Sequence, residues 1–249
     1  MCSETEESKN ILEGEPRIIF LDADNRRLEE HPPLCENEVH LWRAWLNQED
    51  YHREMEMLSE KERIQAERFY FEKDRRSFIM THAMLRKIVG SYLKIDPHDV
   101  KFICGTYGKP SIDGNHNEIC FNMSDSFELA IFAFAQARQV GVDIEYIRPM
   151  HDAQDIVLNF FSPGEKMAID EVEEKQRLEA FFKYWTRKEA YLKAIGKGLM
   201  QPMDSFEASL NRDFIWVRDN PQEVYKWSVR SFNPAPGYVG ALVFEKKSS

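Results

Sequence analysis

The order of strand and helix patterns along the chain is the feature that most restricts its fold. In the first half, strand-like segments at 17–23 and 38–46 precede two helical segments that begin at Ser59 and Asp74, both favourable N-cap residues. A strand–turn–strand segment at 119–135 follows. The second half repeats this order with a strand at VGVDIEYI, helices near 152–160, 163–175 and 178–195, and strands at DSFEASL, FIWVRD, VYKWSVRSF and YVGALVFE. The pattern predicts an α+β fold of two similar halves, arranged as a pseudo-dimer with the active site in the cleft between them.

The boundary between the two halves is expected near residue 137. Residues 1–15 contain little apolar surface to bury, so we expect them to be disordered. The N-terminal α+β half then spans 16–136, and the C-terminal α+β half spans 137–249.

Composition narrows the class of protein. No apolar run approaches the roughly 20 residues that cross a bilayer, and the start MCSETEESKN is unlike a signal or transit peptide. We therefore expect a cytoplasmic protein without membrane partners, acting as a monomer. The formal net charge of −10 argues against binding to nucleic acid. The cysteines lack metal-ligand spacing and are expected to be free thiols: Cys2, Cys35, Cys104 and Cys120.

A glutamate occupies the apolar stripe of the clearest helical segment, RLEAFFKYWTRKEAYLKAIGKGL at 177–199. At 100° per residue, Glu189 falls in the same sector as the apolar residues Leu178, Phe181, Phe182, Trp185 and Leu192. A carboxylate that faces a core loses hydration and needs a partner, a metal or a raised pKa. The alternative is a surface pair of Glu189 with Lys193, worth about 0.2–0.5 kcal/mol.

Three further carboxylates are candidates for binding a metal. Asp143 and Glu145 lie on one face of the strand VGVDIEYI, roughly 7 Å apart, because side chains alternate along a strand. Such a pair suits Mg²⁺ shared with substrate phosphates, although one solvated strand face is an equally good interpretation. Glu165 follows Ser162 and Pro163 at the spacing of a helix capping box, which by itself would explain this glutamate.

The motifs GVDIE, FFSPGE and WTRKEAYLKAIGKGL, preceded by YGKP and FNMSDS, resemble the 4′-phosphopantetheinyl transferase superfamily. The resemblance is to its long, pseudo-dimeric form, typified by the surfactin-synthetase activator, and covers roughly 59–206. The stretches RFYFEKDRR and FFKYWTRKEAYLKA are particularly similar to cyanobacterial members.

The resemblance implies transfer of the phosphopantetheine arm of coenzyme A to a serine of an apo acyl, peptidyl or polyketide carrier protein, with release of 3′,5′-ADP. In that family, Asp143, Glu145 and Glu165 match the residues that bind Mg²⁺, for which Mn²⁺ can substitute. Glu189 matches the proposed general base. Lys193 is expected to help neutralise the pyrophosphate.

The resemblance also implies that Lys109 and Ser124 bind coenzyme A and that Asp125 lies near its 3′-phosphate. Lys188 and Arg68 are further candidate cations for this ligand, and an arginine such as Arg75 or Arg76 could lie between Asp125 and the phosphate. Asp125 departs from the family, which usually has a histidine there that contacts the 3′-phosphate. An aspartate at this place would repel the phosphate. Two alternatives stay open: a catalytically impaired relative that only binds coenzyme A or carrier protein, and another Mg²⁺-dependent phosphotransferase. The chain has no GxxxxGK[ST] loop to support the latter.

Overall fold

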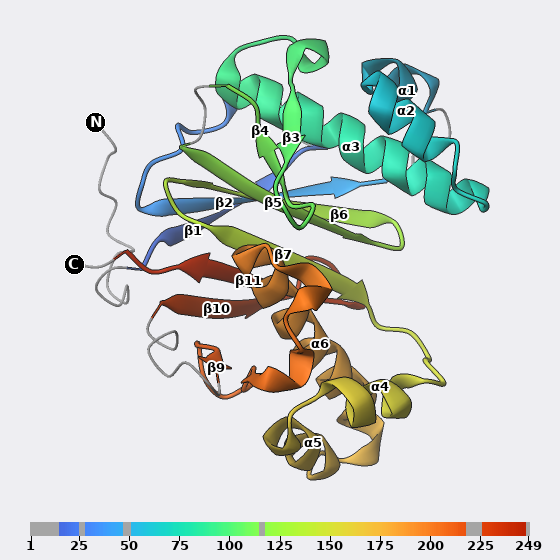
Figure 1. The fold of residues 1–249 in the computed structure, drawn as a ribbon, viewed down its shortest axis with the longest axis vertical. Helices are drawn as coiled ribbons and strands as arrows, with labels where there is room; N and C mark the ends of the chain where they lie inside the picture. Colours follow the sequence, from blue (N-terminus) through green and yellow to red (C-terminus); the bar gives the residue numbers. More distant parts are fainter. Residues whose placement is uncertain (1–14, 25–27, 47–50, 115–117, 218–225, 248–249) are drawn as a thin grey trace.

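The computed structural model describes residues 15–24, 28–46, 51–114, 118–217 and 226–247. The helices, shown in Figure 1, are α1 (His52–Met57), α2 (Glu60–Ala66), α3 (Glu72–Leu93), α4 (Ala153–Phe160), α5 (Pro163–Asp170) and α6 (Glu174–Ile195). The longer strands are β1 (Arg17–Asp22), β2 (Glu38–Trp45), β5 (Ile119–Ser126), β6 (Leu129–Gln136), β7 (Val140–Tyr146), β10 (Trp227–Phe232) and β11 (Tyr238–Glu245). The short strands are β3 (Phe102–Cys104), β4 (Pro110–Ile112), β8 (Phe206–Glu207) and β9 (Trp216–Val217).

Two main sheets form from separate parts of the chain. The N-sheet has the strand order β1-β2-β6-β5, and all its residues precede position 137. The C-sheet has the order β10-β11-β7, and all its residues follow position 139. Within the N-sheet β1 and β2 pair in parallel, and the remaining pairs of both sheets are antiparallel. This is the mixed helix and sheet class that the sequence predicts.

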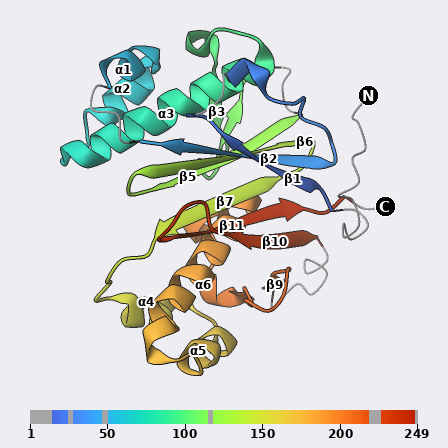
Figure 2. The same ribbon diagram turned by 180° about the vertical axis from the view of Figure 1, so that it is seen from behind.

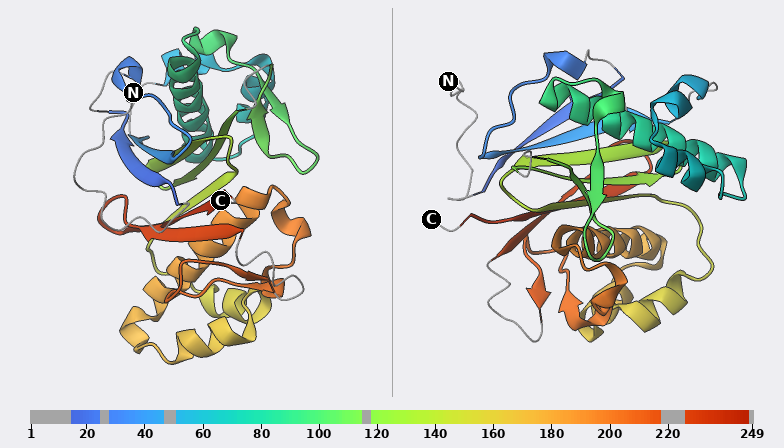
Figure 3. Two further views of the ribbon diagram at one scale, coloured as in Figure 1. Left: turned by 90° about the vertical axis from the view of Figure 1, so that its left-hand side faces the viewer. Right: turned by 45° about the horizontal axis from the view of Figure 1, so that its top comes forward.

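The two sheets and two long helices stack in four layers (Figure 1; Figure 2 gives the view from behind). α3 covers the outer face of the N-sheet, the two sheets pack against each other, and α6 covers the outer face of the C-sheet. Figure 3 shows this stacking from the side. Because side chains alternate along a strand, Val39 and Leu41 of β2 enter the core between the sheets, whereas Trp42 and Ala44 enter the core beneath α3.

The glycine of the GVDIE motif allows α6 to lie directly on β7. A Cβ atom at Gly141 would stand 2.1 Å from the carbonyl oxygen of Ala190 and 2.3 Å from the amide nitrogen of Ala194, far inside van der Waals contact. Any larger residue would push the helix away. The close approach brings the last two turns of α6 over the polar face of β7.

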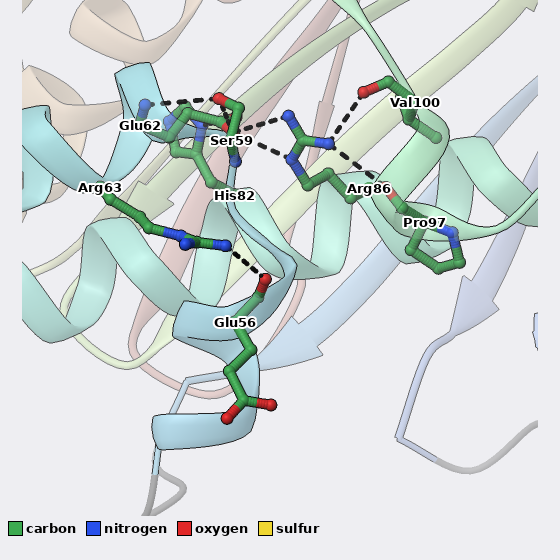
Figure 4. Close-up of polar contacts among 8 residues, drawn as sticks. All are labelled: Glu56, Ser59, Glu62, Arg63, His82, Arg86, Pro97 and Val100. Atoms are coloured by element: carbon green, nitrogen blue, oxygen red, sulfur yellow. Dashed lines mark hydrogen bonds and ion pairs between the residues drawn. The ribbon is translucent and has the colours of Figure 1, made fainter.

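A buried polar network fixes α2 against α3 (Figure 4). Glu62 Oε2 accepts hydrogen bonds from Arg86 Nη2 at 2.7 Å and Nε at 2.9 Å, and Glu62 also forms a capping box with Ser59. The same guanidinium donates to the carbonyl oxygen of Val100 at 2.8 Å. Burial raises the pKa of Glu62, but hydrogen bonds from His82, Ser59 and Arg86 outweigh it and lower the pKa to about 2. The network joins α2, α3 and the segment at 97–100.

Element boundaries differ from the sequence-based expectation at several places. α3 begins at Glu72 with Phe71 as its N-cap, so the prediction that Asp74 caps this helix is wrong. The predicted cap at Ser59 and the capping box of Ser162 are confirmed. α1 and the β3–β4 hairpin were not predicted, because six-residue and three-residue elements carry little periodicity.

Two other expectations concern cysteines and the N-terminus. Cys104 and Cys120 are free thiols, as predicted, and Cys35 Sγ donates a hydrogen bond to the carbonyl oxygen of Pro33. Cys2 and the expected disorder at residues 1–15 fall almost entirely outside the described residues. In the part of the chain that the structure describes, no helix has the length and apolarity to cross a bilayer.

Candidate active site

Asp143 lies where β7, β5 and α6 meet. Its Oδ1 atom accepts hydrogen bonds from Lys193 Nζ at 2.7 Å and from Ser124 Oγ at 2.8 Å. Lys193 Nζ also donates to Ser124 Oγ at 2.9 Å, which closes a triangle of one acid, one cation and one hydroxyl. Helix α6 supplies the lysine because the helix rests on Gly141. The sequence had assigned all three of these residues to the site.

The second oxygen of the same carboxylate is buried without a protein partner. Asp143 is 5% exposed, and among the described residues none donates a hydrogen bond to its Oδ2 atom. Burial raises the pKa of this carboxyl, and the pairing with Lys193 and Ser124 only partly offsets the rise. A buried oxygen of this kind is unfavourable unless a further ligand, such as a cation, uses it.

The carboxylates of Glu145 and Glu189 lie close enough to Asp143 to interact with its charge. Burial raises the pKa of Glu189, and the charges of Asp143 and Glu145 raise it further, against the opposing charge of Lys193. Burial and the charge of Asp143 likewise raise the pKa of Glu145. Glu189 therefore faces the other two acids and not a sealed core, which explains a carboxylate in the apolar stripe of α6.

Glu189 also borders a cavity of about 240 Å³ between the two halves of the chain. Its lining comes from the N-terminal half, including Lys109 and Asn122, and from the end of α6, including Lys193. Side chains from both sides of the residue-137 boundary thus meet at this glutamate.

These acids fit a hard divalent cation that also binds a phosphate. In the described part of the chain, no group of three or more His, Cys, Asp or Glu side chains is arranged so that it could hold a metal ion. Mg²⁺ typically takes one or two carboxylates and completes its octahedral shell with water and substrate phosphate oxygens. The unpartnered Oδ2 of Asp143 and the mutual repulsion of Asp143, Glu145 and Glu189 match that requirement.

Glu165 of α5 and Lys188 of α6 form a closed pair away from Asp143. Lys188 Nζ donates to Glu165 Oε2 at 2.7 Å and to Oε1 at 2.9 Å, and the two side chains are 0% and 1% exposed. The glutamate further accepts from the backbone amides of Ser162 and Ala208. Both carboxylate oxygens are occupied, so this geometry does not support Glu165 as a metal ligand or Lys188 as a contact to coenzyme A.

A second cavity of about 740 Å³ is lined by Asp125 and by Ser126, which donates a hydrogen bond to Glu145. Ser77 Oγ donates a hydrogen bond of 2.7 Å to Asp125 Oδ2. Three cations and three carboxylates line the cavity: Lys73, Arg76, Arg148, Asp74, Asp125 and Glu128. Of the arginines considered from the sequence, Arg76 lines it and Arg68 and Arg75 do not; Arg75 pairs with Glu72 at 3.9 Å.

Lys109 is fully engaged with the protein. Its Nζ atom donates to the carbonyl oxygens of Ala194 at 2.9 Å and Val140 at 3.0 Å, and to the side chain of Gln139 at 3.1 Å. Burial lowers the pKa of this lysine to about 8. The contacts join the loop before β4 to β7 and to the end of α6, so the expected phosphate contact would require these bonds to be exchanged.

Sequence reasoning missed Ser77, Ser126 and Arg148. Ser126 Oγ donates to Glu145 Oε2 at 2.8 Å, and the alternation of β5 could have indicated it, because Ser126 lies on the same strand face as Ser124. Nothing in the sequence pairs Ser77 with Asp125, since 48 positions separate them.

Comparison with known proteins identifies the family. A model of the 4′-phosphopantetheinyl transferase superfamily matches residues 139–243, and a model of the 4′-phosphopantetheinyl transferase N-terminal domain matches residues 41–137. These two segments meet at the boundary between the two sheets.

Individual relatives agree with the two family models. The chain is 39% identical over 181 residues to 4′-phosphopantetheinyl transferase HetI of the cyanobacterium Nostoc sp. (strain PCC 7120), covering 71% of this chain and 76% of that protein. It is 29% identical over 197 residues to 4′-phosphopantetheinyl transferase Sfp of Bacillus subtilis (strain 168), covering 79% of this chain and 86% of that protein. The chain therefore belongs to the 4′-phosphopantetheinyl transferase superfamily, in its long, Sfp-like form.

Proposed function

We propose that the protein is an active phosphopantetheinyl transferase, which moves the 4′-phosphopantetheine arm of coenzyme A to a serine of an apo carrier protein and releases 3′,5′-ADP. The observation that carries this proposal is the meeting of Asp143, Glu145, Glu189 and Lys193, with Asp143 Oδ2 unused by the protein. A protein that only bound coenzyme A would have no need for a half-buried carboxylate beside the other two.

The reaction breaks one phosphoanhydride bond and forms one phosphate ester. The serine oxygen attacks the phosphorus that carries pantetheine, the bond to the other phosphate of the pyrophosphate breaks, and the electron pair leaves on 3′,5′-ADP. The serine proton must be removed during the attack. Glu189 is the base that receives it, directly or through water, because its raised pKa makes its carboxylate a better proton acceptor than an exposed one.

The remaining groups neutralise and orient the pyrophosphate. Asp143 and Glu145 would hold Mg²⁺, or Mn²⁺ in its place, and the ion would neutralise charge on the pyrophosphate oxygens. The Lys193 ammonium, which pairs with Asp143 Oδ1 at 2.7 Å, adds a second cation. Glu165 and Lys188 support the site from outside by fixing α5 against α6.

We propose that the 740 Å³ cavity takes the 3′-phosphate end of coenzyme A. Ser77 keeps the Asp125 carboxylate hydrogen-bonded, and Lys73, Arg76 and Arg148 provide positive charge in the same cavity. This arrangement offsets the repulsion that an aspartate in place of the family histidine would cause. Lys109 acts as a link between the two halves, divided at 16–136 and 137–249, and not as the main phosphate contact.

A single chain supplies both sides of the cavity at Glu189, which supports a monomer. We propose that this monomer acts in the cytoplasm. The experiment that tests the proposed function is incubation with an apo carrier protein, coenzyme A and Mg²⁺, followed by mass spectrometry of the carrier. We expect the carrier to gain the mass of one phosphopantetheine group, and a carrier whose acceptor serine is alanine to gain none. Binding of coenzyme A without any mass gain would instead identify a catalytically impaired relative.

A further inference from the structure

Hydrogen bonds from backbone amides of β7 to side chains of β5 join the two sheets. They form a ladder in place of the usual backbone–backbone bonds between neighbouring strands. Asn122 Oδ1 accepts a hydrogen bond from the Val142 amide at 2.9 Å, and Ser124 Oγ accepts one from the Ile144 amide at 3.4 Å. Ser126 Oγ accepts one from the Tyr146 amide at 3.1 Å. Each acceptor lies 20 positions before its donor, so β5 and β7 run in parallel with a constant register.

Without these side chains, amides of β7 that point toward β5 would lack a hydrogen-bond acceptor. β7 pairs through its backbone with β11 on one side only, and β5 is the edge strand of the other sheet. Every second amide of β7 therefore points toward β5 without a backbone acceptor. Buried amides of this kind need a partner, and the three polar side chains of β5 provide one for the amides of Val142, Ile144 and Tyr146.

Two of the three rungs carry a second hydrogen bond, to an acid of the site. A serine hydroxyl has one proton to donate and two lone pairs to accept with. Ser124 donates its proton to Asp143 Oδ1, and Ser126 donates its proton to Glu145 Oε2. One oxygen of each carboxylate is thereby held against β5, while Asp143 Oδ2 and Glu145 Oε1 accept no hydrogen bond from the described residues.

The end of the ladder is held by an aromatic contact. Phe127 follows Ser126 with φ of 56°, a left-handed conformation that is unfavourable for a bulky side chain. Its ring stacks on Tyr146 at 5.0 Å between centroids and an interplanar angle of 16°. The contact fixes the position at which the last rung, Ser126, meets β7.

We propose that Asn122, Ser124 and Ser126 are positioning residues that set the register of the two halves, and that Ser126 orients Glu145 so that its Oε1 atom faces the ligand site. This inference rests on the proposed function for the identity of the ligands, a divalent cation and a pyrophosphate. Ser126 itself touches neither ligand; it acts through Glu145. Outer hydrogen-bond partners of metal-binding carboxylates typically change metal affinity by 10- to 100-fold when they are removed.

The experiment measures Mn²⁺ binding to the full-length protein by electron paramagnetic resonance, with and without coenzyme A and without any carrier protein. The variants are Ser126→Ala, Ser126→Thr and Ser126→Cys, with Ser111→Ala, an exposed serine on β4, as the matched control. We expect Ser126→Ala to weaken Mn²⁺ binding about tenfold or more. Ser126→Thr, which keeps the hydroxyl, should restore the affinity to within about threefold of the wild type, and Ser126→Cys should fall between them.

Two results would overturn the inference. One is a folded Ser126→Ala protein that binds Mn²⁺ as tightly as the wild type, with only its melting temperature lowered. The other is the absence of Mn²⁺ binding by the wild-type protein in the millimolar range. If Ser126→Ala cannot be obtained folded, a Ser126→Thr protein with tenfold weaker Mn²⁺ binding contradicts the proposal equally, because its hydroxyl is present.

The result is separable from the test of the proposed function. A protein that binds Mn²⁺ in a Ser126-dependent manner but transfers no phosphopantetheine would retain the positioning role and refute the transfer. A protein that transfers the arm with Mn²⁺ affinity independent of Ser126 would retain the function and refute the positioning role.

Discussion

Helix α6 carries two lysine–carboxylate pairs that differ in how completely they are enclosed. In the closed pair, Lys188 and Glu165 are 0% and 1% exposed, and backbone amides occupy the carboxylate further. In the open pair, Lys193 keeps 29% of its side chain exposed, and no described residue donates a hydrogen bond to the second oxygen of Asp143. The closed pair has no capacity left for a ligand, whereas the open pair lies beside two more acids and a cavity.

The difference shows what separates a structural ion pair from a functional one on the same helix. Both pairs join α6 to a neighbouring element at 2.7 Å, so distance does not distinguish them. Unused hydrogen-bonding capacity distinguishes the two pairs, because a buried polar group that lacks a partner is unfavourable until a ligand binds to it. The predictions below break each pair in turn.

The largest effect is expected where the open pair is broken. Asp143→Asn keeps the shape and the acceptor for Ser124 but removes the charge that a divalent cation requires. Since a bound metal ion contributes several kcal/mol to such reactions, transfer should fall about 10³-fold or more. The folded state should lose no more than about 1 kcal/mol, because the Lys193 left behind still reaches solvent. Transfer rates and urea unfolding of the same preparation check both; near-normal transfer at limiting Mg²⁺ would refute the assignment.

Breaking the closed pair should have the opposite profile. Lys188→Met leaves Glu165 buried and uncompensated, which is expected to destabilise the fold by about 3–5 kcal/mol. The double variant Glu165→Gln/Lys188→Met should recover most of this loss, because neither side chain then carries a buried charge. Denaturant unfolding measures the three free energies. A Lys188→Met protein of normal stability with greatly reduced affinity for coenzyme A would return this lysine to the ligand site.

The pH dependence of stability sharpens the comparison in the N-terminal half, where Glu62 and Arg86 form another closed pair. The folded-state pKa of Glu62 is lowered from 4.5 to about 2, so its contribution is complete above pH 4.5 and is lost as the pH falls toward 2. The full loss amounts to about 3 kcal/mol. Glu62→Gln should remove this loss of stability at acid pH, as measured by chemical denaturation at a series of pH values. An unchanged loss would contradict the lowered pKa of Glu62.

In the open pair, the pH dependence of stability is expected to have the opposite sign. The pKa of Asp143 is raised by burial, so its contribution to stability is greatest below the unfolded-state pKa and declines as the pH rises through the folded-state value. Asp143→Asn should remove that decline. The same denaturation series therefore distinguishes the two kinds of carboxylate.

The smallest effect concerns Asp125 at the edge of the open site. A carboxylate near a 3′-phosphate costs on the order of 1 kcal/mol in a water-like dielectric, so Asp125→His should bind coenzyme A about fivefold to tenfold more tightly. Dephospho-coenzyme A, which lacks that phosphate, should bind equally to both proteins. Calorimetric titration at fixed salt and Mg²⁺ measures the four affinities; unchanged affinity for coenzyme A would mean that Asp125 does not face the phosphate.

The sequence was sufficient to predict what local pattern determines. Alternation along VGVDIEYI places Asp143 and Glu145 on the same strand face as Gly141, which meets α6. The two roles of Glu165 could not be separated from the sequence. A capping box and a metal ligand use the same residue type, and only the partner Lys188, 23 positions away, decides between them. The Ser77–Asp125 contact depends on how α3 crosses β5, which no local signal reports.

The most direct test of the central claim compares two glutamates of the C-terminal half. Glu189→Gln and Glu165→Gln remove the same charge, one from the open site and one from the closed pair. Phosphopantetheine transfer to an apo carrier protein is measured per folded molecule at saturating Mg²⁺ and coenzyme A. We predict that Glu189→Gln lowers kcat about 10²-fold or more, the scale of general-base catalysis, while Glu165→Gln stays within about threefold of wild type. The reverse order, with Glu165→Gln inactive and Glu189→Gln active, would contradict the account.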